Sequence, residues 1–552
     1  MTHDPHGPTA HRSAEGTRPN ILFICADQLG AAQIGCYGSG VDSTPTLDRL
    51  AARGVRFDRF YARCPICAPN RATILTGRSP SIHGVTWNNF LLPNDMPTYA
   101  HVLRAAGYAT GGFGKFHQTP MWLEATETVS HLGFEESVVA EDPKWESWID
   151  WVRERAPEHY ETALGMCWPG PRSRAGRSEK ERHAYKEARV AAMRARESGR
   201  WKMAYASPLP AELHDTAYIT ELGLDYMERY SSAGKGGPGA DGADRPFFCH
   251  VSYVDPHDPY DPPEPYASMF DPEEMPQPVQ QAWSPQELPT LQSSTVWNDF
   301  ETAHEDPQAM RELRARFHGS LRYMDDQIAR LIEAAEKLDR PTIVIFATDH
   351  GEMLGDHGLI TKAVKHYDAG IRCPLIVATI NPDEPGGAGA QGGSGRVDRA
   401  LRSSLDLFPT FCDFAGVGEE DRPPLEGRSF AAGGEGHAAL CVEFESVATV
   451  ITDDNWRLTR YADDGVTQLF DLSSDPAEQH DRSADPACVE RKTAMLEELA
   501  GLLLRPHRVP QYRAMVPLGG RRIAPNPVKG GARGPAVTDY ELTPPPDFEE
   551  SE

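Results

Sequence analysis

The chain has 552 residues, with 81 acidic against 55 basic side chains and a formal net charge of −26. This acidic excess excludes a general binder of nucleic acid or of anionic membranes, because both partners repel a strongly negative surface. A chain of this length is too long for one small hydrophobic core, so we expect two domains.

Residues 1–18 are polar and lack the apolar core of a signal peptide, and we expect a disordered tail there. The first apolar run, residues 21–26, is far too short to span a bilayer. The ten cysteines are irregularly spaced and do not form the pattern of a disulfide framework, which agrees with a reducing compartment. These features predict a cytoplasmic location and no membrane attachment.

The first predicted strand, residues 20–26, is largely apolar and is followed directly by Asp27. Continuous apolar runs are typical of strands buried on both faces of a parallel sheet, and open α/β folds place their chemistry at the carboxyl ends of such strands. Asp27 is therefore a candidate metal ligand. An Asp in this place is also a common turn former or helix cap, and taken alone it favours that structural role. A helix over residues 44–53 and a strand over 55–61 follow.

The next motif, residues 64–78, reads CPICAPNRATILTGR. Pro69 suits the first turn of a helix and Gly77 suits its end, which places Cys67 at a helix N-terminus. There the backbone amides and the helix dipole lower the pKa of a thiol and attract anions, and Arg71 adds a cation one turn later. The motif predicts a nucleophile beside an anion site. Its Cys-x-x-Cys spacing also fits a redox pair or half a zinc site, but no second such pair occurs, and a buried Cys in an ordinary loop is the third alternative.

Two later segments also place candidate side chains after predicted strands. A glycine-rich stretch, residues 108–114, leads into Lys115 and His117, which alternate on an extended backbone and can face one pocket. His257 follows the predicted strand 247–254 in a loop that flanking prolines stiffen. Without further matches, an ordinary turn and a surface histidine explain these segments as well.

The predicted strand 342–347 repeats the pattern of the first strand, since it is soon followed by Asp349 and His350. Two buried strands that each lead to a carboxylate are far more informative than one. The carboxyl ends of parallel strands meet at one edge of a sheet, so we expect Asp27 and Asp349 to converge there. A helix over residues 311–337 has the apolar periodicity to pack against this sheet.

The composition divides the chain into four regions. They are a disordered tail over residues 1–18, a catalytic α/β domain over 19–425 with an insertion at about 135–215, a C-terminal subdomain of antiparallel hairpins over 426–505, and a second disordered tail over 506–552. The insertion contains a basic stretch, residues 172–202, that we interpret as a solvated helix, with a lid over an acidic substrate as the alternative. Helices are also expected over residues 401–414 and 492–504.

Cys67, Pro69 and Arg71, followed by Leu-Thr-Gly at residues 75–77, resemble the signature of the sulfatase family, Cys-x-Pro-x-Arg with a Leu-Thr-Gly ending. The resemblance covers roughly residues 19–505. Its other motifs carry Lys115 and His117, His257, and the segment from Asp349 to Lys362. It implies an alkaline-phosphatase-like α/β fold, with a mixed, mostly parallel sheet flanked by helices and a smaller C-terminal antiparallel-sheet subdomain.

The resemblance implies hydrolysis of a sulfate monoester to an alcohol and inorganic sulfate. It implies that a formylglycine-generating enzyme oxidises Cys67 to formylglycine and that one divalent cation is bound. The implied metal ligands are Asp27, Gln28, Cys67, Asp349 and His350. The implied catalytic residues are Cys67, Arg71, Lys115, His117, His257 and Lys362, and the implied substrate contacts are Asn88, Lys115, His257 and Lys362. Asn88 is also typical of a simple turn.

The resemblance also implies how these residues share the work. Arg71, Lys115 and Lys362 neutralise the sulfate, and His257, with Lys362, protonates the departing alcohol. His117 then deprotonates the second hydroxyl of the sulfated formylglycine hydrate, which re-forms the aldehyde and releases sulfate.

Three positions depart from the commonest sulfatase pattern. Gln28 stands where many members have a second Asp, His350 where some have Asn, and Asn70 where Ser or Ala is usual. A neutral amide and an imidazole make the metal site less anionic and softer, so Ca²⁺ is the first choice and Mn²⁺ the second. Similar Asp-Gln and Asp-His pairs occur in relatives that cleave choline sulfate or phosphonate monoesters.

Two alternative functions follow from these departures. One is a phosphonate monoester or phosphodiester hydrolase on the same scaffold, but members of that group tend to carry Tyr and Thr in place of Lys115 and His117, which favours sulfate. The other is a catalytically silent binding protein, the outcome if Cys67 stays unmodified. The sequence leaves the alcohol and the oligomeric state open, with a homo-oligomer as one possibility.

Overall fold

The computed structural model describes residues 18–88, 90–119, 128–144, 147–167, 204–231, 245–284, 286–293, 306–380 and 395–504. Residues 1–510 form one compact unit, and the second unit, residues 511–552, lies outside the described residues. The basic stretch 172–202 and nearly all of both predicted tails also lie outside them. Within the described part, no helix has the length and apolar character that crossing a bilayer requires.

The main sheet has eight strands in the order β10-β2-β9-β7-β1-β6-β4-β5. Strands β7, β1, β6, β4 and β5 run parallel to one another, whereas β9 runs antiparallel to its neighbours β7 and β2. The strands are β1 Asn20–Ala26, β2 Val55–Phe57, β4 Ala109–Gly114, β5 Glu136–Val139, β6 Phe247–Ser252, β7 Thr342–Thr348, β9 Leu375–Ile380 and β10 Arg396–Asp398. The mixed, mostly parallel sheet expected from the sequence is confirmed.

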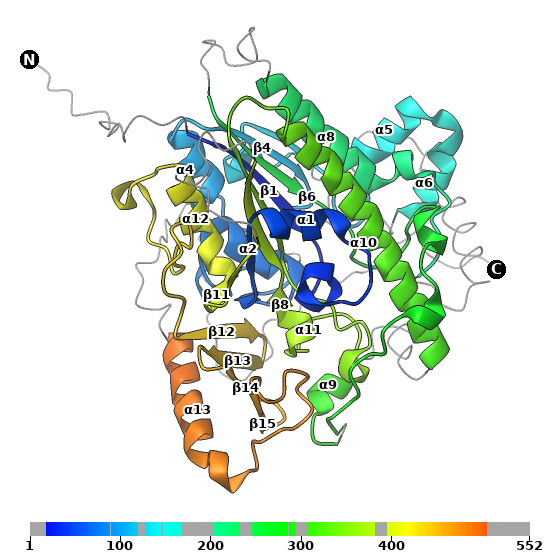
Figure 1. Ribbon diagram of the computed structural model, residues 1–552. Helices are drawn as coiled ribbons and strands as arrows, with labels where there is room; N and C mark the ends of the chain where they lie inside the picture. The colour runs from blue at the N-terminus through cyan, green and yellow to red at the C-terminus, as the bar shows by residue number, and fades with distance from the viewer. Residues whose placement is uncertain are drawn as a thin grey trace, which may run out of the picture. The chain divides into compact units, whose positions relative to one another are not determined.

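Strand β1 lies in the middle of the sheet because both of its faces are apolar. Phe23 packs into the core under α2 (Cys67–Thr76), α4 (Tyr99–Ala105) and α12 (Leu407–Phe414). Ile24 packs into the opposite core under α1 (Pro45–Arg53), α8 (Asp215–Ser231) and α10 (Pro307–Ala335). Figure 1 shows these two helical layers around the strands. Each such fully buried side chain contributes about 1.5–3 kcal/mol to stability, which fixes the position of the residue that ends the strand.

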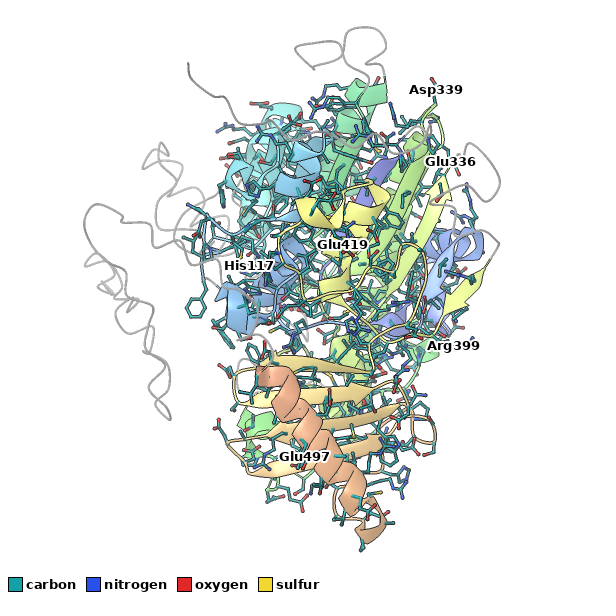
Figure 2. The ribbon with its side chains drawn as sticks, turned by 90° about the vertical axis from the view of Figure 1, so that its left-hand side faces the viewer. His117, Glu336, Asp339, Arg399, Glu419 and Glu497 are labelled. Carbon is teal, nitrogen blue, oxygen red and sulfur yellow. The ribbon has the colours of Figure 1, made fainter. Side chains whose placement is uncertain are left out.

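The C-terminal subdomain is an antiparallel sheet in the order β12-β13-β14-β15, again as expected. Its strands are β12 Ala439–Phe444, β13 Val447–Thr452, β14 Trp456–Tyr461 and β15 Val466–Asp471. Helix α13 (Val489–Leu504) lies across this sheet (Figure 2). The buried Arg457 forms ion pairs with Glu478 and, at 3.6 Å, with Asp368 in α11 (Asp368–Ile371), which ties the subdomain to the main unit.

Two predicted elements are shorter than expected. The chain leaves the main sheet after Phe57, and β3 (Phe60–Tyr61) joins a separate three-stranded sheet between β11 (Arg402–Ser403) and β8 (Arg372–Cys373). Because Arg402 and Ser403 pair as a strand, helix α12 begins only at Leu407. None of the ten cysteines forms a disulfide.

Candidate active site

The candidate site lies at the carboxyl edge of the parallel strands. Asp27 follows β1, Lys115 follows β4 and Asp349 follows β7, and all three side chains are buried. Strand β1 pairs directly with β7 and β6, and β6 pairs with β4, so the strand order brings these chain positions to one edge. Distant sequence segments therefore meet where parallel α/β sheets place their chemistry.

Helix α2 carries the candidate nucleophile to this edge. It begins at Cys67 and ends at Gly77, which adopts the left-handed φ of 62° and donates its N–H to Thr73 O at 2.8 Å. Asn88 accepts a hydrogen bond from the Ala68 N–H at 3.0 Å, so it satisfies one of the open amides of the first turn. In this structure Asn88 supports the helix start that presents Cys67.

Asn70 connects this helix to three other parts of the chain. Its amide nitrogen donates to the backbone oxygen of Asp349, and its Oδ1 accepts from Arg63 N at 3.0 Å and Ser404 Oγ at 2.8 Å. Asn70 is fully buried. The residue that departs from the usual sulfatase pattern therefore locks α2 against the end of β7.

Four buried residues form a group that can hold a metal ion: Asp27, Cys67, Asp349 and His350, whose candidate ligand atoms all lie within 4.8 Å of one another. His350 Nε2 lies 3.2 Å from Cys67 Sγ and 3.6 Å from Asp27 Oδ1. Its Nδ1 lies 3.0 Å from Gly351 O, the partner to which Nδ1–H donates when Nε2 is left free as a ligand.

Gln28, next to Asp27, has a left-handed backbone with a φ of 57°, and its N–H donates to Asp349 Oδ1 at 3.1 Å. Its Nε2 donates to Asp258 Oδ1 at 3.0 Å and to Glu352 Oε2 at 2.5 Å. Both amide protons are thereby used, and the buried Oε1 has no hydrogen-bond partner among the described residues. Two carboxylates, an imidazole and an unpaired amide oxygen are a donor set that fits a divalent cation such as Ca²⁺ or Mn²⁺.

Arg71 holds the carboxyl groups of Asp27 and Asp349 in place. Its Nε donates to Asp349 Oδ2 at 2.8 Å and its Nη2 to Asp27 Oδ2 at 3.2 Å. Nη1 donates to Ser252 Oγ at 2.7 Å and to Lys115 O at 2.8 Å. The guanidinium thus spans the ends of β1, β7, β6 and β4, a positioning role that is separate from the sulfate contact implied by the family resemblance.

Lys115 and His117 enter the site from the end of β4. The Lys115 ammonium forms ion pairs with Asp27 and with Asp142, which follows β5. His117 has a left-handed φ of 54°, and its N–H donates to Glu141 Oε1 at 2.7 Å, so this carboxylate supports the unusual backbone. His117, labelled in Figure 2, is buried and lies close enough to Cys67 to lower the pKa of its thiol.

Lys362 and His257 close the other side of the nucleophile. Lys362 Nζ lies 2.9 Å from Cys67 Sγ and 2.6 Å from His257 Nε2. His257 Nδ1 lies 2.7 Å from Asp258 O, an acceptor for the Nδ1–H. An ammonium thus contacts the sulfur directly, and an imidazole contacts that ammonium.

The charges of the site favour an anion at position 67. Burial raises the pKa of the Cys67 thiol, but Lys115, Lys362 and His350 lower it, and the pKa lies well below its usual range. Burial and Cys67 raise the pKa of Asp27, but Lys115 and Arg71 lower it, so this carboxyl is ionised at neutral pH. The pocket thus stabilises both a metal-facing carboxylate and negative charge on the nucleophile.

The profile of the family described as Sulfatase matches residues 19–417, which is most of the chain. The chain belongs to the sulfatase family. As a sulfatase it is a sulfuric ester hydrolase, and its fold is that of the family.

Curated relatives agree with this assignment. The arylsulfatase of Clostridium perfringens is 25% identical over 481 residues, which cover 84% of this chain and 89% of the relative. The choline-sulfatase of Rhizobium meliloti is 28% identical over 492 residues, covering 85% and 83% respectively. Among solved structures, the phosphonate monoester hydrolase of Silicibacter pomeroyi has a TM-score of 0.67 and 25% identity over 90% of this chain and 96% of that one.

Several residues of this sulfatase site escaped the sequence analysis. They are Glu141, Asp142, Ser252, Asp258 and Glu352. Asp142 repeats the pattern of Asp27, because it follows a strand of the same parallel sheet, but β5 is only four residues long and offers too weak an apolar signal. Asp258 and Glu352 lie within the segments around His257 and from Asp349 to Lys362, but no role was predicted for them, and Glu141 and Ser252 belong to no motif.

Proposed function

We propose that this sulfatase hydrolyses a sulfate monoester to an alcohol and inorganic sulfate with a nucleophile made from Cys67. The observation that carries the proposal is the position of Cys67 at a helix N-terminus, within the group that can hold a metal ion and in contact with Lys362 of the Lys362–His257 pair. A sulfate ester needs a nucleophile, cations for the transferred group and an acid for the leaving oxygen, and each has a residue here.

In this proposal a formylglycine-generating enzyme first converts the Cys67 thiol to the aldehyde of formylglycine. Hydration of the aldehyde then provides two hydroxyl groups on one carbon. One hydroxyl releases its proton to solvent and attacks sulfur as the oxyanion, and the other allows the sulfated intermediate to collapse. A serine or cysteine ester has no such exit, which is the chemical reason for the modification.

Asp27, Gln28, Asp349 and His350 would hold one divalent cation, with Ca²⁺ our first choice and Mn²⁺ the second. When bound, this ion acts as a Lewis acid that polarises an oxygen of the sulfate group. Arg71 keeps the carboxyl groups of Asp27 and Asp349 oriented for it.

The chain's own residues then move the protons. Lys115 and Lys362 bind the anionic oxygens of the substrate while the ester S–O bond breaks. His257, together with Lys362, donates a proton to the departing oxygen, so that a neutral alcohol leaves. His117 takes the proton of the remaining hydroxyl, its C–O bond becomes the carbonyl, and the bond from carbon to the sulfate oxygen breaks. Water then hydrates the aldehyde again.

A second candidate activity is the hydrolysis of phosphonate monoesters. The pairs Asp27–Gln28 and Asp349–His350 favour this activity, because similar pairs occur in relatives that cleave phosphonate monoesters. The similar fold of the Silicibacter pomeroyi phosphonate monoester hydrolase supports it as well. Lys115 and His117 favour sulfate. A binding protein without catalysis is the third alternative and requires unmodified Cys67.

The test compares hydrolysis of an aryl sulfate and an aryl phosphonate monoester by the wild type and by Cys67→Ala, each co-produced with a formylglycine-generating enzyme. Peptide mass spectrometry across residues 64–71 measures the conversion of Cys67. Preferred, Cys67-dependent sulfate turnover supports the proposal, and preferred phosphonate turnover supports the second candidate. Both candidate activities are contradicted if the fully converted protein hydrolyses neither of these esters and also hydrolyses none of a panel of alkyl and sugar sulfates.

A further inference from the structure

The ammonium of Lys115 has a second carboxylate partner besides Asp27. Lys115 is fully buried, and its Nζ forms ion pairs with both Asp27 and Asp142. The Asp142 side chain is only 10% exposed. Asp142 is not a member of the group that can hold a metal ion, so metal binding does not account for a carboxylate at this position.

The backbone around Asp142 is held against the end of β4. The Ala140 N–H donates to Gly114 O at 3.0 Å, and the Lys144 N–H donates to Glu141 O at 2.9 Å, which closes a turn around Asp142. Lys144 has a left-handed φ of 58° and pairs with Asp215 at 2.9 Å. The carboxylate is therefore presented to Lys115 by an ordered turn and not by a free loop.

The charge of Asp142 acts on the same space as the nucleophile. Burial raises the pKa of Asp142, but Lys115 and His257 lower it below its usual range, so the carboxyl is ionised. Lys115 in turn lowers the pKa of Cys67. A negative charge beside this lysine weakens the attraction of the pocket for any anion, and the repulsion felt by a dianion is twice that felt by a monoanion.

We propose that Asp142 is a specificity-determining residue, which makes the pocket selective for esters with one negative charge and against dianionic phosphate monoesters. Sulfate monoesters and phosphonate monoesters are both monoanions, so the inference covers both candidate activities, and it rests on the proposed function. The group that Asp142 discriminates against has nearly the same size and shape as sulfate, which leaves charge as the property by which the two are separated.

The experiment uses three substrates with one leaving group: 4-nitrophenyl sulfate, 4-nitrophenyl methylphosphonate and, at mildly alkaline pH where it is a dianion, 4-nitrophenyl phosphate. Asp142→Asn keeps the shape of the side chain and an oxygen that accepts from Lys115, but removes the charge. We expect kcat/KM for the phosphate, relative to that for the sulfate, to rise roughly tenfold. The ratio between the two monoanionic esters should stay unchanged.

Ratios of kcat/KM make the result independent of the fraction of folded and converted enzyme. Asp142→Glu, which restores the charge, should return the ratio toward that of the wild type. The matched control is Glu136→Gln in β5, because Glu136 pairs with Arg229 at the partly exposed outer side of the same strand. This control should leave all three ratios as they are.

Equal changes for all three substrates in Asp142→Asn would mean that Asp142 only positions Lys115, and that result overturns the inference while leaving the proposed function intact. A relative loss of phosphate turnover overturns it as well. If the converted wild type shows no Cys67-dependent turnover of either monoanionic ester or of any alkyl or sugar sulfate, the proposed function fails and the inference fails with it.

Discussion

Lys362 Nζ lies 2.6 Å from His257 Nε2, and the same ammonium lies 2.9 Å from Cys67 Sγ. At 2.6 Å the two nitrogens are within hydrogen-bond distance, while Asp258 O is the acceptor next to the other ring nitrogen. The pair thus forms a unit that can deliver a proton to an alcohol departing from a sulfate held beside position 67. Neither residue has this property alone.

His257→Asn should lower kcat, and more so for an alkyl sulfate than for 4-nitrophenyl sulfate, because nitrophenolate leaves without protonation. A loss of roughly 100- to 10,000-fold is the usual contribution of a general acid. Steady-state kinetics with both esters measures the difference. His480→Gln is the control, since the His480 side chain is 83% exposed. Equal losses for both esters would remove His257 from the role of acid.

The pH dependence of kcat should reveal the same acid. Burial and Lys362 lower the pKa of His257, but Asp258 and Asp27 raise it, and the pKa becomes about 9. Since the protonated form is active, kcat stays constant at neutral pH and falls as the pH rises through about 9. In His257→Asn this basic limb should disappear. A limb that persists unchanged in the variant must be assigned to another group.

Glu352→Gln should weaken the binding of the divalent cation. Glu352 Oε2 accepts from Gln28 Nε2, and its Oε1 accepts from Leu354 N at 2.9 Å, so the carboxylate holds the Gln28 amide in the orientation that leaves its Oε1 without a hydrogen-bond partner among the described residues. Loss of a residue that orients a metal ligand typically lowers the metal affinity by roughly 10- to 100-fold. Titration calorimetry with Ca²⁺ and Mn²⁺ on chelator-treated protein measures it. Glu336→Gln, in a partly exposed ion pair with Arg53, is the control and should bind as the wild type does.

Asn70→Ala should destabilise the fold by about 1–3 kcal/mol, the usual cost of leaving buried hydrogen-bonding groups without partners. The groups affected are the Arg63 N–H, the Ser404 hydroxyl and the Asp349 carbonyl. Denaturant unfolding of the metal-free protein measures the change. Asn94→Ala, at an exposed loop position, should stay within about 0.5 kcal/mol of the wild type. Equal stability of both variants would show that α2 does not depend on Asn70.

A buried charge cluster outside the site makes stability depend on pH. His214 is enclosed by Asp215 at 3.0 Å, Asp261 at 3.8 Å and Asp255 at 4.0 Å. Burial lowers the pKa of His214, but Asp215 raises it, through charge and a hydrogen bond, and it becomes about 10. This is above the unfolded value of 6.5, so the stabilisation is complete below pH 6.5 and is lost as the pH rises toward about 10.

His214→Gln should remove that part of the pH dependence. The thermal midpoint of the wild type should therefore fall more steeply than that of the variant between neutral and strongly alkaline pH. Differential scanning calorimetry of both proteins in matched buffers measures the two slopes. Parallel slopes would mean that His214 does not bind the extra proton in the folded state.

The sequence determined the local parts of this architecture. The apolar runs before Asp27 and Asp349 predicted two buried strands with chemistry at their ends, because a strand covered on both faces must be apolar throughout. The Cys67–Gly77 segment predicted a helix that starts at the nucleophile, because Pro and Gly mark helix ends through their own backbone preferences. Both features depend only on residues next to one another.

The tertiary structure alone decided which residues support them. The contacts of Asp142 with Lys115, of Glu352 with Gln28 and of Ser404 with Asn70 join segments from different parts of the chain. They exist because β1 lies between β7 and β6 and because β5 lies beside β4, an order that no local pattern encodes. A single Asp, Glu or Ser carries no signal of its distant partner. The charge balance of the pocket therefore became visible only when the strands were placed side by side.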